Sequence, residues 1–220
     1  MLEFNFAVVL AQWPMLLHGV ALTAALTVAS ALLGSLLGTA CAWARLHGGA
    51  VLKQVVGSYV ELVRNTPFII QLFFIFFGLP SLGVRLSVEV ACVLAMVLNL
   101  GAYACEIIRA GLLATSRGQL EAAMSLALTP WQIFSRVVLP PALARIWPAL
   151  VSQIVIVMLG SAVCGQISAE ELSQAANLIS SRTFRSFESY IIATLAYLAL
   201  AIALRQLLNW AGPRFIFVSR

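Results

Sequence analysis

Apolar residues gather into five long stretches along the chain, and short polar segments separate them. A helix needs about 20 predominantly apolar residues to cross a bilayer. All five stretches reach that length, provided that the second is counted across an internal interruption. The pattern therefore predicts an all-α polytopic membrane protein with about five transmembrane helices. The expected spans are residues 15–44, 51–79, 86–112, 140–164 and 189–208.

The second stretch is interrupted at Asn65-Thr66-Pro67. Thr66 is a favoured residue before a helix and Pro67 a favoured first helical residue, so a new helix is expected to begin there after a kink or break. Glu61 and Arg64 precede the break. They are three residues apart and could form an ion pair on one helix face. Gln71 is the polar residue within the apolar run that follows.

The first stretch carries Gly34 and Gly38 in a GxxxG arrangement. Small residues at this spacing let two membrane helices approach closely. The spacing allows a helix-pairing surface there, but such matches arise often by chance in glycine-rich spans.

Composition agrees with a membrane protein formed as one domain over residues 1–220. Hydrophobic residues make up 62% of the chain and charged residues only 10%, whereas a soluble domain carries roughly 25% charged residues. The net charge of +5 is explained by basic residues retained on the cytoplasmic side, so a nucleic-acid partner is not expected. The four cysteines lie in apolar runs without paired spacing, which favours buried inert thiols.

The distribution of Lys and Arg predicts the orientation. Eight basic residues fall on one side of the five expected spans and three on the other, and the richer side is cytoplasmic by the positive-inside rule. The N-terminus is then outside, and the C-terminus and the polar stretch at about 114–140 are cytoplasmic. The richer side carries Arg45, Lys53, Arg117, Arg136, Arg145, Arg205, Arg214 and Arg220, and the other side Arg85, Arg182 and Arg185.

Catalytic signatures are absent from the sequence. It contains no GxxxxGK[ST] motif for ATP, no HExxH and no Cys/His cluster for a metal. An enzyme is not expected, and neither is a cofactor or metal in this chain.

The polar stretch carries the most specific motif. Its residues, in order, are Glu121-Ala122-Ala123, Ala127, Val137 and Leu139-Pro140. This spacing resembles the EAA loop of ABC importer permeases, with Ala127 in place of the usual Gly and Val137 in place of Ile. A short helix is expected over residues 119–127, with the Glu121 carboxylate near its positive start. In the family, this helix lies in a cleft of the ATPase subunit and carries its motion to the spans.

Two more segments resemble the polar amino-acid uptake subfamily (histidine, glutamate, glutamine, arginine and opine importers). The second-span signature consists of Glu61, Arg64, Thr66, Pro67 and Gln71, and the third-span pattern includes Asn99, Tyr103 and Glu106. The resemblance covers about residues 16–210. It implies a type I ABC importer permease fold and the membrane-spanning subunit of an ATP-driven importer, which couples ATPase motion to alternating access.

The resemblance also implies a location and partners. The chain is expected in the bacterial inner (cytoplasmic) membrane, beside a second permease chain in a homo- or heterodimer. ATP-binding subunits, which hold the ATP and Mg²⁺, and a periplasmic or extracellular amino-acid-binding protein complete the expected assembly.

Polar positions inside the spans are candidates for the substrate path. Asn99 and Glu106 share a helix face with Tyr103 between them, and the fourth span carries Ser152 and Gln153. An amide, a phenol and a carboxylate could contact the amino and carboxylate groups of an amino acid. Two alternatives stay open. Glu106 could pair with Arg109 or another helix, or the partner chain alone could hold the site.

No acidic residue occurs between residues 140 and 169, which weakly disfavours arginine or lysine as the substrate. The competing functional class is an ion-gradient-driven secondary transporter or channel, with Glu89 or Glu106 as its ion site. The EAA spacing argues against that class, and five spans do not divide into the repeats common in such carriers.

Overall fold

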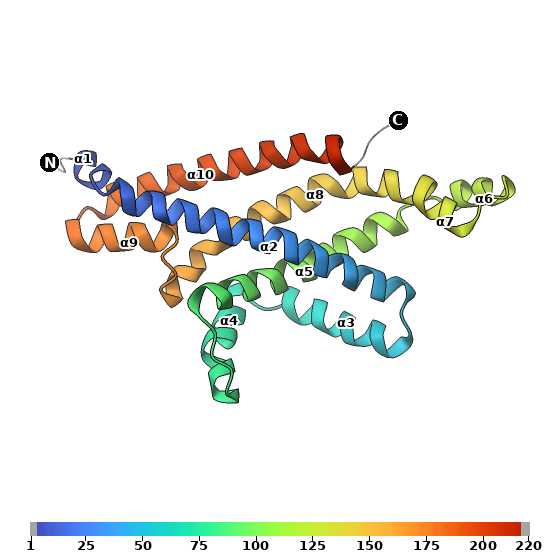
Figure 1. Ribbon diagram of the computed structural model, residues 1–220, viewed down its shortest axis with the longest axis horizontal. Coiled ribbons are helices and arrows are strands. Elements are labelled where there is room, and N and C mark those ends of the chain that lie inside the picture. Colours follow the sequence, from blue (N-terminus) through green and yellow to red (C-terminus); the bar gives the residue numbers. More distant parts are fainter. Residues whose placement is uncertain (1–3, 217–220) are drawn as a thin grey trace.

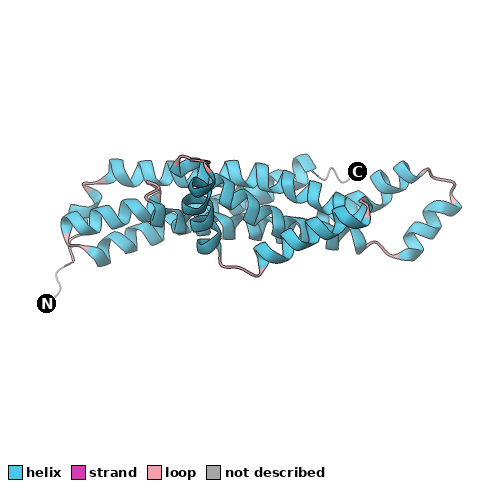
Figure 2. Cartoon of the chain, turned by 90° about the horizontal axis from the view of Figure 1, so that it is seen from below, coloured by secondary structure: helices cyan, strands magenta, loops and turns pink. Residues whose placement is uncertain are grey.

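The structure is a computed structural model that describes residues 4–216, and this part of the chain contains helices and no strand (Figures 1 and 2). The longer helices are α2 (Trp13–His47), α3 (Ala50–Arg64), α5 (Val88–Leu113), α8 (Leu139–Gly160), α9 (Leu172–Thr183) and α10 (Ser186–Ala211). The shorter ones are α1 (Phe6–Leu10), α4 (Phe68–Phe73), η1 (Phe74–Gly78), η2 (Leu79–Leu82), α6 (Arg117–Ser125), α7 (Pro130–Gln132), η3 (Ile133–Val138), η4 (Ser161–Ile167) and η5 (Gly212–Ile216).

The five predicted spans all have a counterpart. Four helical segments are long and apolar enough to cross a membrane, and a bent pair supplies a fifth: Trp13–His47, Val88–Leu113, Pro130–Ile167, Ser186–Arg214, and Ala50–Arg64 with Phe68–Leu82. They form an elongated bundle with α1 and α9 at one end and α6 and α7 at the other (Figure 1). The predicted all-α membrane architecture is confirmed.

The second span is broken more sharply than a kink. Its two helical segments meet at 112°, so α4 points away from the long axis of the bundle (Figure 1). The predicted cap was wrong in detail. Pro67 is the residue before α4, which begins at Phe68, and the Thr66 hydroxyl instead donates to the Leu62 carbonyl at 2.8 Å. This hydrogen bond lies at the end of α3, so it stabilises the α3 side of the break.

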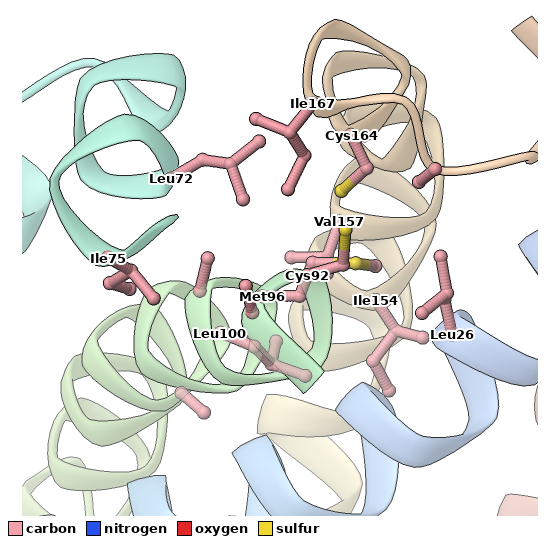
Figure 3. Close-up of a cluster of buried hydrophobic side chains, with 14 of the residues drawn as sticks. Leu26, Leu72, Ile75, Cys92, Met96, Leu100, Ile154, Val157, Cys164 and Ile167 are labelled. Atoms are coloured by element: carbon pink, nitrogen blue, oxygen red, sulfur yellow. The ribbon is translucent and has the colours of Figure 1, made fainter. Parts of the chain in front are cut away.

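Helix α5 lies at the centre of the bundle. Its side chains Cys92, Met96 and Leu100 are fully buried against α2, α4 and α8. Figure 3 shows them between Leu72 and Ile154 from the flanking helices. The four cysteines are buried and free, as expected. Because α5 contacts α2, α3, α4 and α8, its position fixes that of the polar groups it carries.

The GxxxG glycines mediate the packing of α2 on α5, so the spacing reflects a helix-pairing surface. A Cβ atom on Gly34 would lie 2.8 Å from the Leu100 Cβ, and one on Gly38 would lie 2.5 Å from the Ala104 Cβ. Both distances are shorter than side chains tolerate, so only glycine permits this approach.

The polar segment between the fourth and fifth expected spans, residues 165–188, contains the helix α9, which the apolar pattern did not indicate. Glu171 precedes α9 and is fully buried. Its carboxylate accepts hydrogen bonds from the backbone N–H groups of Ser173 (2.9 Å) and Gln174 (2.8 Å) and from the hydroxyl of Tyr197 on α10. These three donors anchor the start of α9 to α10.

A second contact anchors α9 to α2. The Leu172 N–H donates to the hydroxyl of Thr23, which is also fully buried, at 3.2 Å. Glu171 lies between the spanning segments, and burial raises the pKa of its carboxyl group while the bonds from Tyr197 and the two backbone N–H groups oppose the shift. We call Glu171, Thr23 and Tyr197 the outer anchor.

Candidate functional site

A small cavity lies where α4, α5, α8 and η4 meet. Its volume is about 150 Å³. Asn99 provides the only amide among the lining residues, which are Phe68, Asn99, Ile156, Val157, Gly160 and Val163. A mostly apolar pocket with one polar group is typical of a small-molecule site.

Hydrogen bonds hold Asn99 against the break in the second span. Its Nδ2 atom donates to Oε1 of Gln71 at 3.2 Å. The Gln71 Nε2 atom in turn donates to the carbonyl oxygens of Val63 (2.7 Å) and Thr66 (3.0 Å) and to the Thr66 hydroxyl (3.0 Å). Gln71 therefore satisfies carbonyl groups that the break leaves without helical partners. Hydrogen bonds therefore connect Gln71 and Thr66 of the second-span signature to the asparagine that lines the cavity.

Tyr103 lies one helical turn from Asn99 on α5, and it contacts α3. The guanidinium carbon of Arg64 lies 5.4 Å from the centre of the Tyr103 ring, in a cation–π arrangement. The expected ion pair between Glu61 and Arg64 does not form. The α3 helix instead directs Arg64 across to α5.

Glu106 is enclosed by two arginines. One carboxylate oxygen pairs with Arg45 of α2, and the other accepts from Nη2 of Arg109 at 2.8 Å. All three side chains are between 20 and 31% exposed. The structure therefore shows the alternative in which Glu106 pairs with Arg109 and with another helix. We call these three residues the inner ion cluster.

The polar pair on α8 lies beside the cavity. Gln153 precedes the lining residues Val157 and Gly160 by four and seven positions, so it shares their face one turn closer to the α6 end. Ser152 is exposed and stands four residues before Ile156. Within residues 4–216, the Gln153 amide forms no hydrogen bond to another residue.

The predicted coupling helix is present as α6, displaced from the expected bounds by two residues. The Ser116 hydroxyl caps it by accepting from the Gln119 N–H at 3.4 Å. Ala123 is buried against the chain, whereas Glu121 and Ala122 are exposed. Because α6 begins at Arg117, Glu121 is beyond the first turn, and the expected dipole interaction was wrong.

Ala127 keeps the backbone conformation that the family glycine would adopt. Its φ is +51°, in the left-handed region that costs a residue with a Cβ roughly 1–2 kcal/mol. The chain then continues through α7 and η3 to Pro140, which is the second residue of α8. The left-handed turn redirects the chain after α6 despite the strain.

A larger cavity of about 500 Å³ lies between α2, α5, α8 and α10. Its lining is almost entirely apolar and includes none of the predicted site residues. Because it offers few polar groups for recognition, the smaller cavity at Asn99 is the better candidate for a polar substrate.

Sequence reasoning missed the role of Arg45 and the burial of Glu171. A signal for Arg45 was present, since it follows Gly38 by seven residues and so lies on the α2 face that packs against α5. Glu171 gave no comparable signal, because it stands beside the exposed Glu170 in a polar segment.

Comparisons with known proteins agree with this geometry. Residues 31–217 match the family described as "Binding-protein-dependent transport system inner membrane component". The arginine transport system permease protein ArtQ of Bacillus subtilis (strain 168) is 32% identical, over 92% of this chain and 93% of that protein. The probable glutamine ABC transporter permease protein GlnM of the same strain is 36% identical, over 84% of this chain and 86% of that protein.

A solved structure also resembles this chain. A crystal structure of an amino acid ABC transporter with histidines matches with a TM-score of 0.89 and 33% identity, over 97% of this chain and 100% of that one. The relatives are ABC permease subunits, so the ion-gradient-driven alternative is set aside, and the chain is a transport component rather than an enzyme. The chain belongs to the family of inner membrane components of binding-protein-dependent transport systems.

Proposed function

We propose that this chain is the permease subunit of an ATP-driven importer for polar amino acids. The names of the similar permeases mention arginine or glutamine. The cavity at Asn99 offers an amide to a polar ligand. The proposed substrate path comprises Asn99, Tyr103, Glu106, Ser152 and Gln153. The proposed ATPase contact comprises Glu121, Ala122, Ala123, Ala127 and Pro140, and the second-span signature supports the path.

One observation carries the proposal: a single unbroken helix, α5, joins the cavity to the coupling helix. Asn99 lies near the middle of α5 (Val88–Leu113), and α6 begins four residues after α5 ends. A helix of this length transmits displacement without bending sharply unless it contains a kink. Movement of α6 would therefore reach the cavity wall.

The cavity is too small to be a complete site. Ligand pockets enclose roughly 300–1,000 Å³, and this one has about half the lower value. A second permease chain, identical or different, would complete it. Each chain would then supply one wall of a path that opens alternately to the two sides.

The remaining assignments follow from the same assembly. ATP and Mg²⁺ would be held by separate ATP-binding subunits, and a periplasmic or extracellular binding protein would deliver the amino acid. The bundle has α6 at one end and α1 at the other, and α10 runs from the α1 end towards the α6 end (Figure 1), which supports a cytoplasmic C-terminus and an outside N-terminus in the bacterial inner membrane. Arg220, counted in the basic side, lies outside the described residues.

Charge reversal at Glu121 tests the proposal. The importer is purified from its native membrane with its partner chains, and amino-acid uptake and ATP hydrolysis are measured in liposomes. Glu121→Lys places a cation on the exposed face of α6, whereas Glu89→Lys makes the same change at an exposed position at the far end of α5. We expect Glu121→Lys to lower uptake at least tenfold relative to ATP hydrolysis, or to release the ATPase, and Glu89→Lys to do neither.

Wild-type uptake in Glu121→Lys would exclude the docking role. A wild-type chain that purifies without a nucleotide-binding subunit, or an assembly that imports no amino acid, would contradict the proposed function as a whole.

A further inference from the structure

The charges along the polar face of α5 are unequal. The inner ion cluster contains Arg45 and Arg109 but only one acid, Glu106. Both oxygens of that acid are occupied by guanidinium groups. A carboxylate with two cationic partners has little free capacity for the ammonium group of a substrate. Glu106 is therefore a poor site for a positive ligand group.

Arg64 is in the opposite situation. It is exposed at the end of α3 and rests on the Tyr103 ring. Among residues 4–216, no carboxylate lies within 4.0 Å of it, although Glu61 stands three residues earlier on the same helix. The aromatic ring restricts the guanidinium group without neutralising its charge. An anion could therefore bind Arg64 without displacing an acidic partner.

The Arg64 guanidinium group rests on Tyr103, one helical turn along α5 from the residue that lines the cavity. Tyr103 and Asn99 are four residues apart on α5, so their Cβ atoms lie roughly 5–6 Å apart on one face, and Asn99 lines the cavity. The facing helix adds no compensating acid, because α8 and η4 contain none. Three arginines and one glutamate thus border the path from Asn99 towards α6.

We propose that Arg64, positioned on Tyr103, binds the carboxylate of the transported amino acid, and that this path favours neutral and acidic amino acids over cationic ones. The inference rests on the proposed importer function. A guanidinium group binds a carboxylate through two parallel hydrogen bonds. The positive charges of Arg45, Arg64 and Arg109 repel a lysine- or arginine-like side chain. Asn99 remains available for the amino group.

Direct ligand binding tests this assignment. The importer, purified with its partner chains but without the binding protein, is dialysed to equilibrium against labelled L-glutamate, L-glutamine or L-arginine. We expect the wild type to bind glutamate and glutamine more tightly than arginine. Arg64→Gln should weaken glutamate and glutamine binding about tenfold, the factor for losing one charge-assisted hydrogen bond, and Arg64→Lys, which keeps the charge but not the two parallel bonds, should weaken it less.

The matched control is Arg85→Gln, which removes an exposed arginine from the turn before α5 and should leave binding unchanged. Arg64→Glu should reverse the preference, so that arginine binds more tightly than glutamate. A purely structural role of Arg64 would not reverse this order. Co-purification of the partner chains checks that each variant assembles.

The outcomes separate the two claims. Unchanged binding in Arg64→Gln, or a wild type that prefers arginine, overturns the role of Arg64. An assembly that imports amino acids into liposomes but binds none in dialysis also overturns it, while leaving the importer function intact. An assembly that neither binds nor imports amino acids overturns both.

Discussion

Two glutamates, one towards each end of the bundle, are stabilised in different ways. At the outer anchor, Glu171 accepts hydrogen bonds from neutral donors, two of which are backbone N–H groups. In the inner ion cluster, Glu106 is held between the long side chains of Arg45 and Arg109. The first carboxylate is fully buried, and the second is about one-fifth exposed.

The difference bears on which end can move. Backbone donors cannot follow a displaced carboxylate unless α9 unwinds, so the outer anchor has one geometry. Long guanidinium side chains can keep contact with a carboxylate while their helices shift. The flexible pairing lies at the α6 end, where the proposed ATPase motion enters. The comparison therefore predicts a rigid outer end and an adaptable inner end.

Breaking the outer anchor should have the largest effect. Glu171→Ala leaves two backbone N–H groups and the Tyr197 hydroxyl without their acceptor, which should cost about 3 kcal/mol of unfolding free energy. Denaturant unfolding in detergent measures the loss. The adjacent Glu170→Ala removes an exposed glutamate and should change stability by less than about 0.5 kcal/mol. Equal losses in the two variants would show that the buried bonds are not the cause.

Removing the inner acid should have a smaller effect. Glu106→Gln leaves Arg45 and Arg109 as neighbouring like charges, at a cost of about 2 kcal/mol because the cluster is partly exposed. Adding Arg45→Met to Glu106→Gln removes one of the two repelling charges and should recover about half of that cost. Strictly additive losses in this double-mutant cycle would show that the two residues are not coupled.

The outer anchor should also give stability a dependence on pH. Burial raises the pKa of Glu171 above its ordinary value of 4.5, so the folded chain binds the proton more tightly than the unfolded chain does. The contribution to stability is then complete below pH 4.5 and is lost as the pH rises through the folded pKa, by at most about 1.4 kcal/mol per pH unit. Unfolding of the wild type and of Glu171→Gln between pH 4 and 8 measures the contribution. A difference between the two proteins that does not vary with pH would contradict the prediction.

The smallest expected change in stability is at Ala127, at the α6 end of the bundle. Ala127→Gly should relieve the left-handed strain and raise the unfolding free energy by up to about 1 kcal/mol. Amide hydrogen exchange in α6 should slow accordingly. Ala114→Gly is the matched control, because Ala114 has a φ of −79° and glycine gains nothing there. Faster exchange in Ala127→Gly would show that Ala127 is not strained.

The length of the apolar stretches predicted the spans because bilayer thickness sets the length of a transmembrane helix. Close packing at Gly38 and the break at Pro67 were also predictable, since each depends on a local property of one residue type. The left-handed conformation of Ala127 could be anticipated only from the resemblance to the EAA loop, where Gly is usual at this position. Nothing in the alanine itself requires a positive φ.

The contacts between distant segments were not predictable in the same way. Asn99 and Glu106 were selected as polar residues within a span, but their partners come from α4 and α2, and spacing along α5 does not identify those helices. Helix α9 was missed because its sequence is polar and short. Its start depends on Glu171 and Thr23, and each lies in a different segment.

The bend in the second span has a consequence for biogenesis. Neither α3, with 15 residues, nor α4, with 6, is long enough to cross the hydrocarbon core alone. The carbonyl groups at the break are bonded by Gln71, which is itself bonded by Asn99. Asn99 is synthesised 28 residues after Gln71, so the break has no complete set of partners when it leaves the ribosome. We expect this span to remain beside the insertion machinery until α5 emerges, and the two to enter the lipid together.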